Sequence, residues 1–191
     1  MILSMAMALL ASPSWGYKQE DLDKLAATNT CQECDLAGAD LHLAYLREAN
    51  LTKANLTKAN LEKAILTKAN LTKANLEKAI LTKANLAGAD LRGTVLGVAF
   101  LPLADLREAD LERVDLSHAS LRGANLAGAN LERANLEKAD LAGADLAGAD
   151  LRGTVLTGAV LRNAKIDFAD FTKAKFCNTV MPAGQRIFRD C

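Results

Sequence analysis

Aromatic residues, proline and histidine are scarce in this chain of 191 residues: aromatics make up 4%, and there are three prolines and two histidines. Because 50% of the residues are nevertheless hydrophobic, the core must be built from small and aliphatic side chains. The formal net charge is zero, with 23 basic and 23 acidic residues, so the overall balance favours no charged partner. No run of 18 apolar residues occurs, and the sequence therefore predicts no transmembrane helix.

What the sequence does contain is a five-residue repeat, as in LTKANLTKANLEKAILTKANL. Counting central residues from Leu36 to Met181 gives 30 units without a break. On a helix of about 3.6 residues per turn these leucines would scatter around the axis, and in a plain strand they would alternate between faces. An extended triplet followed by a two-residue corner keeps alanine and leucine facing inward. The period therefore predicts one solenoid domain whose stacked coils bury a continuous Leu and Ala ladder.

Tandem A(N/D)LxX units of this kind resemble the pentapeptide repeat family. The resemblance covers residues 34–183 and implies an all-β fold: a right-handed quadrilateral β-helix with four units per coil, or about 7.5 coils here. Glycine stands at the second corner position in nine units, where a type II turn requires a positive φ angle. Lysine and arginine units are expected to use another turn type at the same position.

Both ends of the chain differ from the repeat. Residues 1–16 begin with an apolar run and end in small residues, which resembles a secretory signal cleaved after Gly16; a buried N-terminal helix is the alternative. Residues 17–33 include the amphipathic stretch KQEDLDKLAAT, which predicts a short helix that caps the open strand edge of the first coil. Residues 184–191 form a tail that is expected to cap the other end.

The four cysteines lie at the two ends of the repeat: Cys31, Cys34, Cys177 and Cys191. If the repeat phase extends back by one unit, Cys31 and Cys34 face inward across one corner, close enough to bond. A bond between Cys177 and Cys191 would close the tail onto the last coil. We favour two structural disulfides in an exported chain; a redox pair, half of a zinc site and free thiols are the alternatives. Neither a metal nor a cofactor is expected.

The end segments TNTCQECDLAGADL and FCNTVMPAGQ resemble those of exported pentapeptide repeat proteins of cyanobacteria and chloroplasts. This resemblance implies a location in the thylakoid lumen or the periplasm, with the cytoplasm as the alternative. The sequence departs from that pattern after Pro182, where the usual Asp-Gly is replaced by Ala183-Gly184.

Charge is banded along the repeat. Residues 51–85 carry seven basic and two acidic side chains, a net charge of +5, whereas residues 86–150 carry six basic and eleven acidic ones, a net charge of −5. The first band owes its charge to a basic belt, one lysine at the second corner position of seven consecutive units: Lys53, Lys58, Lys63, Lys68, Lys73, Lys78 and Lys83. We interpret the belt as a solvated face; attraction to an acidic protein or a lipid surface is the alternative. Because no aromatics interleave the lysines, single-stranded nucleic acid is not the expected partner.

Outward positions are mostly polar, but a candidate interaction strip breaks this rule. Its members gather mainly on one side when residues are counted by twenty: Leu43, Ile80, Val95, Val98, Phe100, Leu103 and Val160. An exposed apolar strip of this kind can mark a protein interface.

A catalytic role is not predicted. An enzyme requires acids, bases or nucleophiles that converge on a pocket, and a rod filled with leucine and alanine offers none. We therefore predict a non-catalytic interaction module with an unidentified protein partner, monomeric or weakly self-associating. The best understood pentapeptide repeat proteins mimic DNA with strongly acidic rods and bind type II topoisomerases. The acidic 86–150 band makes this role the alternative, although the zero net charge, the basic belt and the signal-like start argue against it.

Overall fold

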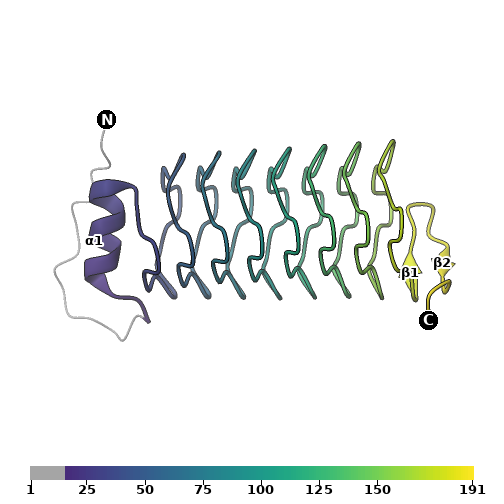
Figure 1. Cartoon of the computed structure of the whole chain (residues 1–191), viewed down its shortest axis with the longest axis horizontal. Coiled ribbons are helices and arrows are strands. Elements are labelled where there is room, and N and C mark those ends of the chain that lie inside the picture. The colour runs from purple at the N-terminus through teal and green to yellow at the C-terminus, as the bar shows by residue number, and fades with distance from the viewer. Residues whose placement is uncertain (1–15) are drawn as a thin grey trace.

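The computed structural model describes residues 16–191 and shows a rod of stacked coils between two terminal caps (Figure 1). The predicted signal segment lies outside the described residues, except for Gly16. Parallel β-bridges join each outward residue to the residue 20 positions later, from Thr30↔Asn50 to Val160↔Val180. One coil therefore contains 20 residues, or four of the five-residue units.

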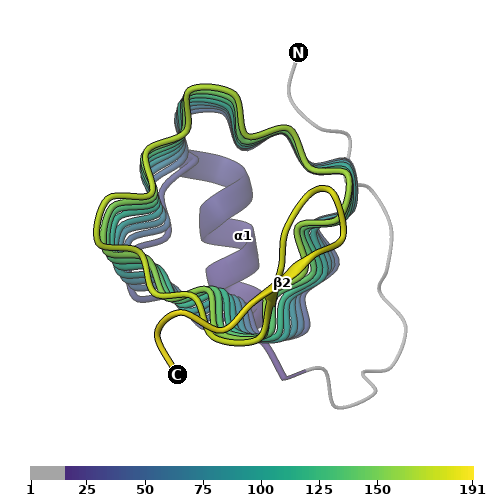
Figure 2. The ribbon, with the colours of Figure 1, turned by 90° about the vertical axis from the view of Figure 1, so that its right-hand side faces the viewer.

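The coils are held together by short extended segments rather than by long strands. Because the chain turns after every triplet, each unit contributes an isolated bridge to the neighbouring coil. Hydrogen bonds still run along the rod: the Leu56 N–H donates to the Asn75 carbonyl at 2.7 Å, and the Asn75 N–H donates to the Ala54 carbonyl at 2.9 Å. This ladder stacks every inward residue on its equivalent in the next coil (Figure 2).

Leucine and alanine fill the interior. The central leucines from Leu51 to Leu161 are at most 1% exposed. Three threonines, Thr94, Thr154 and Thr179, take the alanine position and are buried as well. Each donates its hydroxyl to a leucine carbonyl at 2.7 to 3.0 Å, so the buried polar groups are satisfied.

The corners all adopt one backbone conformation. The second corner residue has φ between 54° and 60° in the non-glycine units and between 63° and 72° in the glycine units. In a typical unit the Ala39 N–H donates to the Leu36 carbonyl at 3.0 Å, which closes a β-turn with positive φ at its third position, as in type II. The expectation of another turn type in the lysine and arginine units is therefore wrong. Where Asn or Asp precedes the central residue, its side chain can support the corner: the Asn55 side-chain oxygen accepts the Thr57 N–H at 3.2 Å.

The helix α1 (Gln19–Thr28) covers the first coil. Its apolar side chains Leu22 and Leu25 are buried, and Asn29 ends it in the left-handed conformation with its N–H bonded to the Leu25 carbonyl. No helix within residues 16–191 combines the length and the hydropathy needed to cross a bilayer.

The C-terminal cap is a small antiparallel hairpin of β1 (Thr179–Val180) and β2 (Arg186–Ile187). After β2 the chain folds back on the last coil, where the Asp190 N–H donates to the Phe176 carbonyl at 2.8 Å. Figure 2 shows that the hairpin covers only part of the last coil.

Candidate interaction surfaces

Four apolar side chains form a compact group on one face of the rod. Ile80 and Phe100 are bridged in neighbouring coils, and Val98 and Leu103 flank Phe100 at the two adjoining corners. These side chains are 42% to 56% exposed although all are large and apolar. Leu103 leans toward the following coil, since its Cδ2 lies 2.9 Å from the point where a Cβ on Gly123 would stand. We call Ile80, Val98, Phe100 and Leu103 the apolar patch.

The other members of the predicted strip are not part of this patch. Leu43 lies three coils before Leu103 in the same corner column, and lysines occupy the two coils between them. Val95 belongs to a neighbouring column, bridged to Asn75 and Asp115. Val160 lies three coils beyond Phe100 and is only partly exposed. The strip is therefore one patch with separate apolar residues around it.

The basic belt occupies successive corners, with each lysine at the second corner position. Three of its lysines are ion-paired: Lys53 with Glu33 at 2.7 Å, and Lys63 and Lys78 with the glutamates that precede them. Hydrogen bonding to Lys53 lowers the pKa of Glu33. Within the described residues the other four have no carboxylate at salt-bridge distance: Lys58, Lys68, Lys73 and Lys83.

Most acids of the 86–150 band form ion pairs with basic side chains of the band or, for Asp145 and Asp150, with Lys165 and Arg152 just beyond it. Nine of its acids lie within 4.0 Å of a lysine or arginine nitrogen, whereas Glu108 and Asp115 do not. Three arginines each donate hydrogen bonds from two guanidinium nitrogens to the aspartate two residues earlier: Arg92 to Asp90, Arg107 to Asp105 and Arg152 to Asp150. These hydrogen bonds lower the pKa of each aspartate. The band keeps its net charge but presents few unpaired carboxylates.

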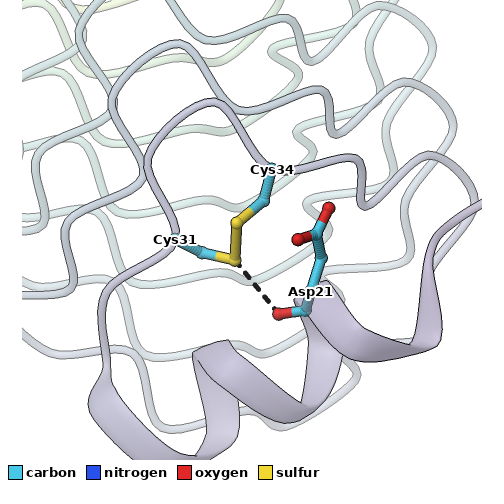
Figure 3. A group of neighbouring side chains, drawn as sticks. All are labelled: Asp21, Cys31 and Cys34. Carbon is cyan, nitrogen blue, oxygen red and sulfur yellow. Dashed lines mark hydrogen bonds between the residues drawn. A yellow bond between two sulfur atoms is a disulfide. The ribbon is translucent and has the colours of Figure 1, made fainter.

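The cysteines are bonded in pairs at the two ends. Cys31 and Cys34 form a disulfide across a corner with their Cα atoms 5.3 Å apart, and Cys177 and Cys191 form a second one. Figure 3 shows Asp21 beside the first pair, with the Cys31 sulfur 3.0 Å from its carbonyl oxygen. Because a disulfide sulfur carries no proton, this is a close S···O contact rather than a hydrogen bond.

Asp21 and this cysteine pair offer three possible ligand atoms within 4.8 Å of one another, the arrangement that a metal site would require. Metals bind thiolates, however, and the two sulfurs are bonded to each other. The Asp21 carboxylate instead accepts the Asp35 N–H at 2.7 Å. In this state the group closes the first coil and is not a set of metal ligands.

Sequence reasoning missed exposed apolar residues outside the strip. Phe168 is the most exposed of them at 97% and lies at a corner of the last coil, and Tyr45, Ile65 and Phe188 are exposed as well. Phe168 occupies the second corner position, where an apolar residue could have been recognised as outward-facing by the same count that identified Leu103.

Comparisons with known proteins agree with the coil architecture. A family model described as "Pentapeptide repeats (8 copies)" matches residues 31–67, 66–97, 104–143 and 139–178. A comparison with curated protein sequences found no match.

Several solved structures are similar to this chain. HetL, a pentapeptide repeat protein involved in heterocyst differentiation regulation in Nostoc sp. strain PCC 7120, is 32% identical, with 90% of this chain and 99% of HetL covered and a TM-score of 0.29. A pentapeptide repeat protein of the Arabidopsis thaliana thylakoid lumen is 33% identical over 54% of this chain and 68% of its own, with a TM-score of 0.41. QnrB1, a plasmid-mediated fluoroquinolone resistance protein, is 20% identical over 78% of this chain and 82% of its own, with a TM-score of 0.51. The repeat match and the QnrB1 fold together imply a right-handed β-helix.

Proposed function

Because the chain belongs to the pentapeptide repeat family, we propose that it is a non-catalytic interaction module whose protein partner docks on the apolar patch. The observation that carries this proposal is the exposure of four large apolar side chains, 42% to 56%, on a rod whose outward positions are otherwise mostly polar. Burying such side chains contributes about 25 cal/mol per Å² of apolar surface, so a partner that covers them gains affinity. The packed Leu and Ala interior makes the rod a rigid support for the patch.

The test is in-cell cross-linking of the full chain, comparing the parent with Phe100→Asp. We expect the parent to yield a defined cross-linked complex and Phe100→Asp to lose it, because a carboxylate at the centre of the patch must be desolvated on docking. Phe168→Asp is the matched control, since Phe168 is fully solvated at the end of the rod. A complex that survives Phe100→Asp unchanged rules out the patch as the docking site.

We also propose that the protein is exported to the thylakoid lumen or the periplasm rather than retained in the cytoplasm. Two disulfides and the signal-like segment before Tyr17 support this location. Intact mass spectrometry of the native protein, with thiol blocking before and after reduction, tests it. A mass that starts at Tyr17 with four thiols blocked only after reduction is expected; a full-length chain with four free thiols contradicts export.

The alternative is a DNA mimic that binds a topoisomerase through the 86–150 band. Its net charge of −5 favours that role. The ion pairs of nine of its acids weigh against it, because a DNA mimic needs uncompensated negative charge to attract a basic partner. Inhibition of supercoiling by purified gyrase, measured with and without the protein, separates the two roles.

A further inference from the structure

A pocket of about 330 Å³ lies on the same side of the rod as the apolar patch. Bridges connect Phe100 to Ser120, Ser120 to Asp140 and Asp140 to Val160, so these four residues form one column. Val160 lines the pocket together with residues of the adjoining corner: Arg122, Ala142, Gly143, Arg162 and Asn163. The patch and the pocket therefore share one face, with the pocket centred two coils beyond the patch.

The pocket exists because small residues stand between two arginines. Arg122 and Arg162 occupy the same corner position two coils apart, roughly 10 Å along the rod, and the corner between them is Ala142-Gly143. A Cβ placed on Gly143 would meet nothing within 4 Å, so the space above this corner is open. Both arginines line the pocket, so a ligand that enters it lies beside both side chains.

This face of the rod carries more basic than acidic side chains. The face consists of the outward column through Ile80, Phe100 and Val160 and the corner on each side of that column. Over residues 56–163 these positions carry seven basic side chains and four acidic ones. All four acids are paired within the face: Glu62 with Lys63, Glu77 with Lys78, Glu137 with Lys138 and Asp140 with Arg122. Lys58, Lys83 and Arg162 are left without a carboxylate at salt-bridge distance in the described residues. The unpaired cations lie on both sides of the patch along the rod.

We propose that this face binds an acidic segment of the protein partner, with an apolar side chain on the patch and carboxylates at the flanking cations. The proposal rests on the docking role of the apolar patch proposed above. Arg162 suits the pocket end because a guanidinium binds a carboxylate through two parallel hydrogen bonds. Arg122, which donates to Asp140 at 2.8 Å, is already oriented at the opposite wall.

The spacing along the rod sets the length of the ligand. Two coils separate Phe100 from the centre of the pocket, which Arg162 lines from the third coil, and one to two coils separate Phe100 from Lys83 and Lys58. At about 4.8 Å per coil and about 3.3 Å per extended residue, two coils correspond to three residues of peptide. The structure therefore selects an extended segment with an acidic residue about three positions on either side of an apolar one.

The probe is a labelled seven-residue peptide with leucine at its centre, glutamate at both ends, and glycine and serine between them. Its binding is followed by two-dimensional NMR of the full oxidised protein, which reports the Phe100, Gly143 and Arg162 amides separately. We expect shifts confined to this face and saturable binding that weakens with added salt. A peptide with glutamine in place of both glutamates should bind about tenfold more weakly.

Charge reversal locates the site. Arg162→Glu should weaken the glutamate peptide about tenfold, whereas Lys68→Glu, an equal charge change at a corner that does not border this face, should leave it unchanged. Equal effects of the two variants, equal binding of the two peptides, or no binding overturn the proposal. If the protein binds phosphatidylserine vesicles more strongly than the peptide, and this binding depends on Arg162, then the face binds lipid and the proposal of an acidic peptide ligand is wrong. If the peptide fails while Phe100→Asp still abolishes the cross-linked complex, the docking role of the patch stands and only its acidic ligand is wrong.

Discussion

At the residue scale, the second corner position is where the fold constrains the chain most. In every unit from Glu33 to Asn163 this residue donates its N–H to the next coil, as Lys68 does to the Ala87 carbonyl at 3.0 Å. That bond and the turn both require a positive φ, which costs a residue with a Cβ about 1 kcal/mol relative to glycine. Lysine, arginine and glutamate accept this cost because coil stacking leaves no other conformation.

Glycine corners should differ in how well they accept a side chain. Gly143→Ala meets open space and should lower the free energy of unfolding by only about 0.5–1 kcal/mol, since alanine also restricts the unfolded chain. Gly158→Ala should cost about 1–2 kcal/mol, because the new Cβ would stand 3.0 Å from the Lys138 Cγ. Equilibrium urea unfolding of both variants checks the order. Equal losses would mean that backbone conformation alone sets the cost.

These corners also show where sequence reasoning is limited. The five-residue period and the inward positions of Leu and Ala could be predicted because each follows from periodicity. The turn type of lysine corners could not, because intrinsic preference assigns positive φ to glycine, whereas in this fold the turn and the hydrogen bonds between coils impose it on lysine. The strip was likewise predicted by counting, but its division into a patch and separate residues depends on which coils carry lysine.

At the element scale, each cap supplies an aspartate whose carboxylate accepts a hydrogen bond that a further coil would otherwise accept. At the first coil, the Asp35 N–H donates to the Asp21 carboxylate, and the Asp35 carbonyl accepts the Lys18 N–H at 3.0 Å. At the last coil, the Phe176 N–H donates to the Asp190 carboxylate at 2.8 Å. Each carboxylate thus satisfies a strand-edge donor that would otherwise invite another strand. The sequence pattern predicted a helix near α1, but the two-residue strands β1 and β2 are too short to leave a periodic signal.

The C-terminal cap should loosen in acid. The Phe176 N–H, and after it Arg189, hold the pKa of Asp190 below its ordinary value of 3.8. A depressed pKa in the folded state means that the carboxylate stabilises the cap above pH 3.8 and that this contribution is lost as the pH falls through the folded value. The Phe176 amide shift, followed by NMR titration, should report this transition.

Asp190→Asn provides the control for this titration. Asparagine retains an acceptor oxygen but does not titrate, so the Phe176 amide should become independent of pH in the acid range. An Asp190→Asn protein whose Phe176 amide titrates like the parent would assign the transition to another group.

At the scale of the whole molecule, the rod is a one-dimensional stack in which each coil depends on its neighbours and the two ends decide how it behaves in solution. Interior coils have a coil on both sides, whereas the first coil relies on α1 and the last on the hairpin and the Cys177–Cys191 disulfide. In the oxidised chain α1 covers the first coil and the hairpin covers part of the last one, so mainly the sides of the rod are available to a partner.

Undocking α1 should turn the rod into a self-associating protein. Leu25 is 3% exposed against the first coil, so Leu25→Asp places a charge in that interface and should release the helix. The exposed coil edge would then pair with another molecule, because its N–H and carbonyl groups have lost their partners. Sedimentation velocity over a range of concentrations should show a larger apparent mass than the parent.

Lys24→Asp, an exposed position on the same helix, should leave the mass unchanged. If Leu25→Asp keeps the parent's mass and its circular dichroism, the helix is not what protects the edge, and the Cys31–Cys34 disulfide becomes the next feature to remove.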